Sequence, residues 1–140
     1  MQDMTTKGRV LIVDDDDDLR EAMVMLLGNR YETFEATNGL EALALLEKVE
    51  VDVVILDENM PKMGGHECFE MLRKRAFNIP VIFCTGKPAE FTKKRELNLG
   101  AFDYISKPLN AEVFLQLVAE GHRAMIRIRQ ILDRNDKRAS

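Results

Sequence analysis

Five polar side chains follow closely on short apolar runs of the sequence, and their types suit a metal ion and an anion. They are three carboxylates, one hydroxyl and one ammonium, namely Asp14, Asp15, Asp57, Thr85 and Lys107. Adjacent carboxylates repel one another unless a cation neutralises them, and a hard divalent ion such as Mg²⁺ takes oxygen ligands and can bridge to a phosphate. Lysine and threonine can hold the oxygens of the anion. Brought together, these side chains would fit a phosphoryl group held between a metal ion, a cation and a hydroxyl.

The apolar runs that precede these side chains are expected to be strands. Most are continuous stretches of aliphatic and aromatic residues, which is typical of a strand buried on both faces of a parallel sheet. The runs lie at 9–13, 32–36, 53–56, 80–84 and 101–105. Between them, apolar residues recur every three or four positions, which is the spacing of a helix. This spacing predicts helices around 19–27, 40–49, 68–72 and 91–99, and a last helix from about Asn110.

Strands that alternate with helices predict an α/β fold, in which helices cover both faces of a parallel sheet. In such folds, ligands bind beyond the carboxyl ends of the strands. The five polar side chains stand just past those ends. The fold would therefore gather them on one rim of the sheet.

The composition is that of one globular domain. The chain has 140 residues, of which 46% are hydrophobic and 31% charged, and its formal net charge is −4. Mild acidity disfavours a protein whose main partner is a nucleic-acid backbone. No apolar stretch approaches the roughly 20 residues that span a bilayer, and the polar N-terminus has no apolar signal region. We therefore expect a cytoplasmic protein that binds neither a membrane nor nucleic acid directly.

Four segments are similar, in content and in order, to the receiver domain of bacterial two-component response regulators, which has the chemotaxis-type fold. The segments are Leu11–Asp15, Asp57–Gly65, Cys84–Gly86 and Tyr104–Pro108, and the resemblance covers roughly residues 8–121. It implies a flavodoxin-like, doubly wound sheet of five parallel strands in the order 2-1-3-4-5, with five helices. It also implies a phosphorylation-activated signalling switch, which receives its phosphoryl group from a histidine kinase or a phosphotransfer protein.

The resemblance assigns roles to the residues of the rim. It makes Asp57 the phosphoacceptor and implies a Mg²⁺ or Mn²⁺ ion held by Asp14, Asp15, Asp57 and the backbone carbonyl of Asn59. A receiver of this kind catalyses only its own phosphorylation and dephosphorylation, so it is not expected to be an enzyme in the ordinary sense. Transfer would depend on positioning and charge neutralisation rather than on a dedicated base.

Further roles follow from the same resemblance. Lys107 would pair with the phosphoryl oxygens, and the bond between Lys107 and Pro108 is expected to be cis, which proline readily permits. Thr85 resembles the switch hydroxyl that moves toward the phosphoryl group, and Tyr104 resembles the switch aromatic that turns inward once Thr85 has moved. Residues that flank the site are expected to tune the lifetime of the phosphoryl group, namely Glu58, Asn59 and Lys87.

Other polar residues are expected to serve the fold. One residue of the run 16–18 is expected to cap the first helix, where a carboxylate also favours the helix dipole. His66 and His122 have no metal-ligating partner at a suitable spacing, so we expect both at the surface or in loops. Cys68 is expected in the core, and Cys84 is expected to be a small buried hydrophobe.

The last helix is longer than covering a sheet requires. Its apolar stripe runs from Val113 to Leu132, which predicts one helix to about Arg134 and a frayed C-terminus beyond it. We therefore expect a disordered tail at 1–7, a receiver domain at 8–121 and a helical extension at 122–140. An extended apolar stripe favours a partner helix, which indicates a homodimer or a downstream protein target. The alternative is the start of a linker helix to an output domain.

Two other functions compete with the switch. A phosphatase of the haloacid dehalogenase type also uses an aspartate at a strand end, but it typically needs a second aspartate two residues later, where this chain has Asn59. A receiver-like scaffold that is never phosphorylated is the second alternative. It is disfavoured because all five rim residues are present.

Overall fold

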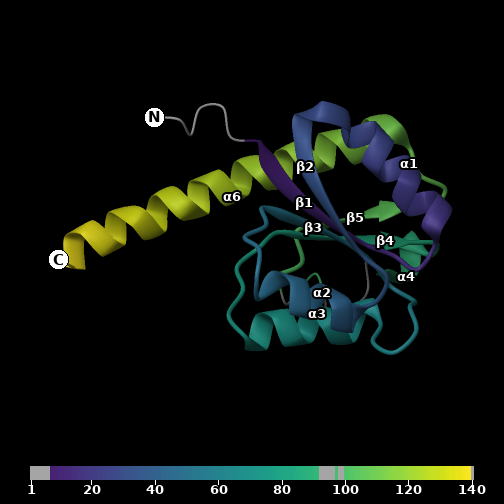
Figure 1. Ribbon diagram of the computed structural model, residues 1–140, viewed down its shortest axis with the longest axis horizontal. Coiled ribbons are helices and arrows are strands. Elements are labelled where there is room, and N and C mark those ends of the chain that lie inside the picture. The colour runs from purple at the N-terminus through teal and green to yellow at the C-terminus, as the bar shows by residue number, and fades with distance from the viewer. Residues whose placement is uncertain (1–6, 92–96, 98–99, 140) are drawn as a thin grey trace.

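The computed structural model describes residues 7–91, 97 and 100–139, which form a five-stranded sheet with helices on both faces (Figure 1). The strands are β1 (Gly8–Val13), β2 (Tyr31–Ala36), β3 (Val53–Asp57), β4 (Val81–Thr85) and β5 (Asp103–Ser106). Their order is β2-β1-β3-β4-β5, and every neighbouring pair is parallel. The predicted fold class is therefore confirmed, and the carboxyl ends of the strands share one edge.

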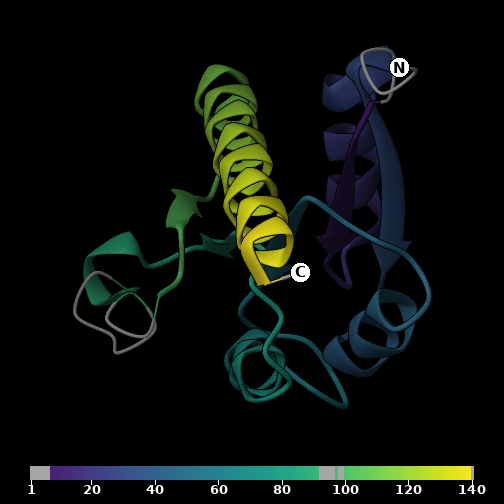
Figure 2. The ribbon, with the colours of Figure 1, turned by 90° about the vertical axis from the view of Figure 1, so that its left-hand side faces the viewer.

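Helices flank the sheet in two layers. They are α1 (Asp17–Leu27), α2 (Gly39–Leu46), α3 (Gly65–Lys74), α4 (Pro88–Phe91) and α6 (Ala111–Ala139), with a short 3-10 helix, η2 (Gly28–Arg30), after α1. Figure 1 shows α1 and α6 on one face of the sheet and α2 and α3 on the other. Figure 2, in which the C-terminal end of α6 points toward the viewer, shows the same separation.

The two layers enclose separate hydrophobic cores because successive strand residues point to opposite faces. On β1, Val10 and Ile12 pack in the core that also holds Met23 of α1 and Phe114 of α6. Leu11 lies between them in sequence and packs in the other core, beneath α2 and α3. The central strands are thus buried on both faces, which explains their continuous apolar sequence.

Polar side chains cap the N-termini of two helices next to the rim, α1 and α2. The Asp16 carboxylate accepts hydrogen bonds from the backbone N–H groups of Asp18 and Leu19, at 3.0 and 3.2 Å. Asn38 accepts one from the Glu41 N–H at 3.0 Å, at the start of α2. These caps satisfy donors that a helix leaves without partners in its first turn. The expected cap within the run 16–18 is therefore confirmed, and it is Asp16.

Helix α6 departs furthest from the sequence expectation. It continues past Arg134 to Ala139, because a helix that has already formed propagates into polar residues without needing an apolar stripe. The expected helix at 91–99 lies mostly outside the described residues, and so do residues 1–6 of the expected tail. Among the described helices, none combines the length and the hydropathy that crossing a lipid bilayer requires.

Candidate functional site

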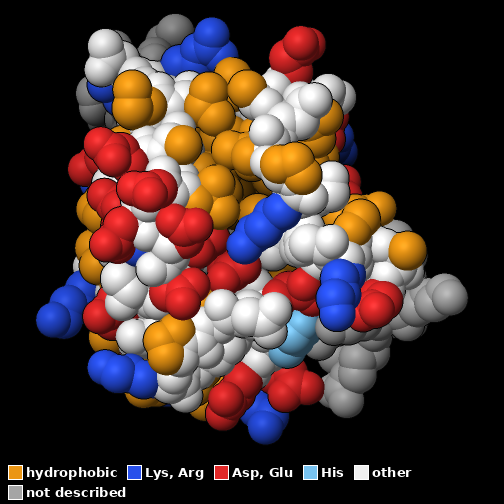
Figure 3. Space-filling view, turned by 90° about the vertical axis from the view of Figure 1, so that its right-hand side faces the viewer, with side chains coloured by type: hydrophobic (Ala, Val, Ile, Leu, Met, Phe, Trp, Pro, Cys, Tyr) orange, Lys and Arg blue, Asp and Glu red, His pale blue; other side chains and the backbone are white. Residues whose placement is uncertain are grey.

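The carboxyl ends of β1 and β3 bring three aspartates together. Carboxylate oxygens of Asp14, Asp15 and Asp57 all lie within 4.8 Å of one another. Asp14 and Asp57 are buried, with 2% and 5% of their surface exposed, whereas Asp15 is exposed. Figure 3, which views the molecule from the right-hand side of Figure 1, shows acidic side chains gathered on this face. The sequence prediction of a carboxylate cluster at the rim is therefore confirmed.

The backbone at the end of β1 fixes the direction of Asp14. Its N–H donates to the carbonyl of Ala36 at 3.1 Å, which extends the pairing of β1 with β2 by one residue. Its carbonyl accepts from the Arg20 guanidinium at 2.7 Å, and its Oδ1 accepts from the Asp16 N–H at 2.9 Å. One carboxylate oxygen, Oδ2, is left facing the site.

Lys107 reaches this cluster from the loop after β5. Its Nζ donates to Asp57 Oδ1 at 2.8 Å and lies 3.8 Å from Asp14 Oδ2. The Lys107 N–H donates to the carbonyl of Thr85 at 2.7 Å, and the bond between Lys107 and Pro108 is cis. The loop is thus held against the end of β4, and its ammonium faces the carboxylates as the sequence predicted.

Burial disfavours the ionised forms of Asp14, Asp57 and Lys107, whereas the opposite charges of Lys107 and the aspartates favour them. Burial raises the pKa of Asp57, and the hydrogen bond and charge of Lys107 offset this only in part. Burial also raises the pKa of Asp14, which the Asp57 charge raises further. For Lys107, burial lowers the pKa, but the hydrogen bond to Asp57 and the charges of Asp57 and Asp14 outweigh it, so the net shift is upward. The site has more negative charge than its single ammonium balances.

The excess of negative charge and the state of one oxygen atom, Asp14 Oδ2, indicate that a divalent cation would fit the site. Asp14 Oδ2 is buried and has no hydrogen-bond partner among the residues that the structure describes. Buried polar atoms are almost always partnered, so such an oxygen aimed into a carboxylate cluster suits a metal ligand. The donor set consists of carboxylate oxygens, which hard cations such as Mg²⁺ prefer.

Thr85 and Tyr104 lie on the same face of the sheet, on neighbouring strands. Thr85 is 1% exposed, and its hydroxyl accepts a hydrogen bond from the Lys87 N–H at 3.0 Å. Tyr104 pairs across the strands with Phe83 and is half-buried, with its ring 5.4 Å from that of Phe91. Both predicted switch residues are therefore next to the rim, although Tyr104 contacts the core rather than the carboxylates.

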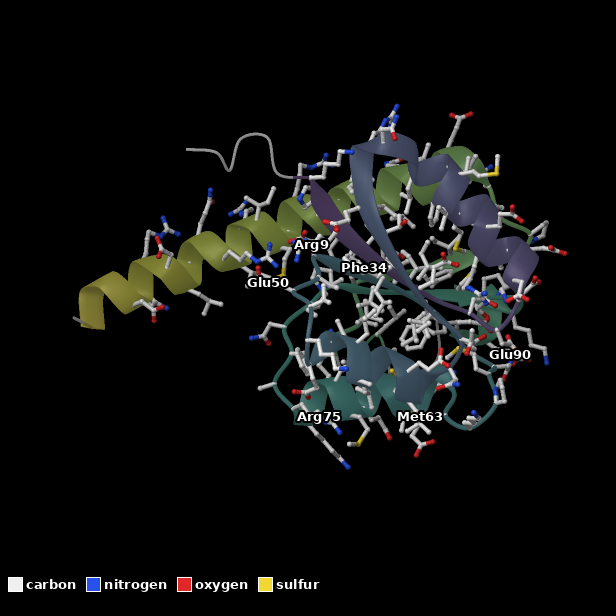
Figure 4. All side chains as sticks on the ribbon, viewed as in Figure 1. Arg9, Phe34, Glu50, Met63, Arg75 and Glu90 are labelled. Atoms are coloured by element: carbon white, nitrogen blue, oxygen red, sulfur yellow. The ribbon has the colours of Figure 1, made fainter. Side chains whose placement is uncertain are left out.

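A recess of about 370 Å³ lies beside the carboxylate cluster, where the loops after β3 and β4 meet. Its lining comprises Glu58, Asn59, His66, Gly86, Lys87 and Glu90. It thus brings together all three residues that the resemblance predicts to tune phosphoryl lifetime. Figure 4 labels Glu90 at this end of the molecule, opposite the end where α6 leaves the sheet.

His66 is a residue of this recess that sequence reasoning missed. The expectation that both histidines are surface or loop residues is met only in part, because both lie on helices and are partly buried. The His66 ring stacks on Phe83 at 5.3 Å, and His122 meets the Tyr31 ring edge-on at 5.8 Å. A lone histidine carries no spacing signal. The one available signal was its position three residues before Phe69, at the edge of the buried stripe of α3.

Comparison with known proteins places the chain in a family. Residues 10–119 match the family described as the response regulator receiver domain. The sensory transduction protein RegX3 of Mycolicibacterium smegmatis is 40% identical over 121 residues, which cover 84% of this chain and 50% of the relative. The regulatory protein AtoC of Escherichia coli is 36% identical over 110 residues, covering 78% of this chain and 24% of the relative. The chain thus spans half or less of the length of these relatives.

Solved structures agree with this match. The chemotaxis response regulator CheY4 of Vibrio cholerae superposes with a TM-score of 0.75 at 33% identity, over 83% of this chain and 99% of that one. A CheY-like receiver domain protein of Methanospirillum hungatei gives a TM-score of 0.79 at 29% identity, over 87% and 98%. The comparisons give no support to the phosphatase interpretation. Given a family match that spans most of the chain, the protein belongs to the response regulator receiver domain family of two-component signalling.

Proposed function

We propose that Asp57 accepts a phosphoryl group from a histidine kinase or a phosphotransfer protein, and that this modification switches the protein's output. The observation that carries the proposal is a buried carboxylate, Asp57, which is hydrogen-bonded to Lys107 and grouped with two further aspartates at a strand end. Membership of the receiver domain family supports the interpretation of this carboxylate as a phosphoryl acceptor. The chain would act as a cytoplasmic switch that catalyses only its own phosphorylation and dephosphorylation.

The proposed reaction is an in-line displacement at phosphorus. A carboxylate oxygen of Asp57 attacks the phosphorus atom, the bond from phosphorus to the donor's histidine nitrogen breaks, and that nitrogen keeps the electron pair. An ionised carboxylate needs no base to activate it, so the protein contributes positioning and charge. Lys107 moves from pairing with Asp57 to pairing with the phosphoryl oxygens, which its ammonium can bind as a point charge.

A divalent ion would complete the charge balance. Asp14, Asp15, Asp57 and the backbone carbonyl of Asn59 are the proposed ligands, and Mg²⁺ or Mn²⁺ would neutralise the phosphoryl oxygens there. The cluster of carboxylate oxygens supports this assignment, and so does Asp14 Oδ2, which accepts no hydrogen bond from the residues that the structure describes.

The switch would use Thr85 and Tyr104. The Thr85 hydroxyl now accepts from the Lys87 N–H, and it would turn to donate to a phosphoryl oxygen. Its departure from the face it shares with Tyr104 would leave room for the tyrosine ring to turn inward. Glu58, Asn59 and Lys87 would set how long the phosphoryl group survives, because they line the recess beside it.

The proposed output is a protein contact rather than DNA binding. The described part of the chain ends in α6, whose later turns expose Ile126, Ile131 and Leu132 at 41%, 45% and 49%. Exposed apolar side chains on a helix that projects from its domain favour packing against another helix. We propose a second copy of the chain as the first partner to test, with a downstream protein target as the alternative.

Intact mass measurement tests the modification. Wild type, Asp57→Asn and the matched control Asp18→Asn, which changes an exposed aspartate, are incubated with acetyl phosphate and Mg²⁺. We expect one phosphoryl adduct on wild type and on Asp18→Asn, and none on Asp57→Asn. An adduct on Asp57→Asn would place the acceptor elsewhere. If no protein gains an adduct, a stable beryllofluoride complex would indicate a short-lived phosphoryl group, and its absence would indicate a scaffold.

A further inference from the structure

Asp14 and Asp15 are neighbours in sequence, yet both carboxylates converge on Asp57. Oxygens of all three carboxylates lie within 4.8 Å of one another. In an extended strand, successive side chains point to opposite faces, so a simple continuation of β1 would direct only one of the two neighbours to this place. The chain instead bends at Asp15. The orientation of the peptide group between Asp14 and Asp15 therefore decides whether their carboxylates meet.

Arg20, on the first turn of α1, binds this peptide group. Its Nη1 donates to the carbonyl oxygen of Asp14 at 2.7 Å, and that carbonyl belongs to the peptide group that joins Asp14 to Asp15. Asp14 is buried, and a buried carbonyl is costly to leave without a donor. The bond from Arg20 thus fixes the plane of the peptide group from which the two carboxylates diverge.

Arg20 is itself held from two further directions. Its Nε donates to Glu35 Oε1 on β2 at 3.1 Å, and its Nη2 donates to Asp17 Oδ1 on α1 at 2.6 Å. Only 12% of the Arg20 side chain is exposed. A guanidinium presents its donors in a rigid planar fork, so acceptors on three elements hold it in one place. The two carboxylates also balance its positive charge, which leaves geometry as its contribution to the rim.

We propose that Arg20 is a positioning residue for the divalent cation, which sets the Asp14 and Asp15 carboxylates at the spacing that the ion requires. This inference rests on the proposed function, in which both aspartates are metal ligands. Mg²⁺ demands near-ideal octahedral geometry, so carboxylates that drift apart bind it more weakly. Groups that hold metal ligands in place typically contribute roughly ten- to hundredfold to metal affinity.

The direction of the effect separates geometry from charge. Loss of a positive charge beside the site would by itself tighten the binding of a cation. Arg20→Met removes the charge together with the bond to the Asp14 carbonyl, and we expect it to bind Mn²⁺ roughly tenfold more weakly than wild type. Arg20→Lys keeps the charge and one donor but loses the planar fork, so it should recover part of the affinity.

The matched control is Arg127→Met, which makes the same change in net charge at an exposed arginine of α6. Binding is measured with Mn²⁺ alone, from the electron paramagnetic resonance signal of the unbound ion, so this readout does not depend on phosphorylation. Melting temperatures in a chelating buffer verify that each variant is folded at the temperature of the assay. Arg127→Met should bind Mn²⁺ as wild type does.

The rate of phosphorylation by acetyl phosphate gives a second readout. In Arg20→Met the Mg²⁺ concentration for half-maximal rate should rise as the affinity falls, while the rate at saturating Mg²⁺ stays within roughly twofold of wild type. A merely structural role would not produce this split. Mn²⁺ binding by Arg20→Met that equals or exceeds that of wild type overturns the inference alone. A wild type that binds no Mn²⁺ overturns the metal site of the proposed function, and the inference with it.

Discussion

At the residue scale, Asp57 and Asp14 carry charges that their surroundings oppose. Burial raises the pKa of both carboxyls, and the single ammonium of Lys107 compensates only in part. An acidic group whose pKa is raised by folding destabilises the folded state when it is ionised. The proposed acceptor is therefore kept charged at some expense to stability, which is the pattern expected where charge serves a reaction.

Replacing Asp57 by asparagine should stabilise the metal-free protein. Removing one of the clustered charges relieves the net unfavourable environment, so we expect a gain of roughly 1 kcal/mol and a higher melting temperature in a chelating buffer. Saturating Mg²⁺ should stabilise wild type more than Asp57→Asn, by about 2.7 kcal/mol for wild type at a hundredfold excess over its Kd. Asp18→Asn is the control, and a lower melting temperature for Asp57→Asn in the chelating buffer would contradict the prediction.

The two cysteines should be inert and should make the fold sensitive to alkaline pH. Burial raises the pKa of Cys68 and of Cys84 to about 12. The folded state therefore holds these protons where the unfolded chain, with a thiol pKa near 9.0, releases them. Their contribution to stability is complete below pH 9.0 and is lost as the pH rises toward 12. Iodoacetamide at about pH 8.5, near the ordinary thiol pKa, should alkylate neither thiol in the native protein and both in denaturant, as read by intact mass.

At the element scale, helix α6 is anchored where it leaves the sheet. Asp52, just before β3, is 5% exposed, and its carboxylate accepts from the Arg9 N–H at 2.7 Å and from the guanidinium of Arg129 on α6. Arg129 also lies 3.8 Å from Glu50. Figure 4 labels Arg9 and Glu50 close together at this end of the sheet. The later turns of α6 are therefore tied to the domain by a buried carboxylate.

Breaking this anchor should weaken the fold and loosen the helix. Arg129→Met leaves the buried Asp52 carboxylate without its cationic partner, and because Arg129 is partly exposed we expect a loss of about 1–2 kcal/mol in urea unfolding. Amide hydrogen exchange should accelerate around residues 126–136. Arg127→Met, an exposed arginine of the same helix, is the control. A loss in Arg129→Met that is unchanged in the Asp52→Asn background would show that the two residues are not coupled.

The positions of the strand ends could be predicted from the sequence, but the contacts between single polar side chains and the end of the last helix could not. Asp57 and Thr85 were predictable because a parallel sheet brings its strand ends to one edge, so position in sequence implied position in space. Two contacts could not be predicted, that of His66 with Glu58 and that of Arg129 with Asp52. A single polar residue has no periodic pattern that would indicate its partner, whether the partner is 8 or 77 residues away. The predicted end of α6 is too early because the apolar stripe stops at Leu132, whereas the helix continues without it.

At the scale of the whole molecule, α6 extends the chain beyond its domain. Figure 1 shows its C-terminal turns running clear of the sheet. The predicted division at residue 121 stays a prediction, and the helix crosses it without a break. Met125, at 8% exposed, and Arg129 lie past that point and still contact the domain. Truncation after residue 121 would therefore remove part of what holds the receiver together.

Phosphorylation and assembly should be linked through the exposed end of α6. If a second copy covers Ile131 and Leu132, burying these side chains favours the dimer by about 25 cal/mol per Å² of apolar surface removed from water. We expect light scattering to show a larger mass with Mg²⁺ and beryllofluoride than without it. Leu132→Glu should return the protein to monomer while leaving the phosphoryl adduct on Asp57 intact, because the helix end is far from the rim. Leu40→Glu, at another exposed leucine, is the matched control and should still assemble. A monomer in every state would leave a downstream target as the partner of this helix.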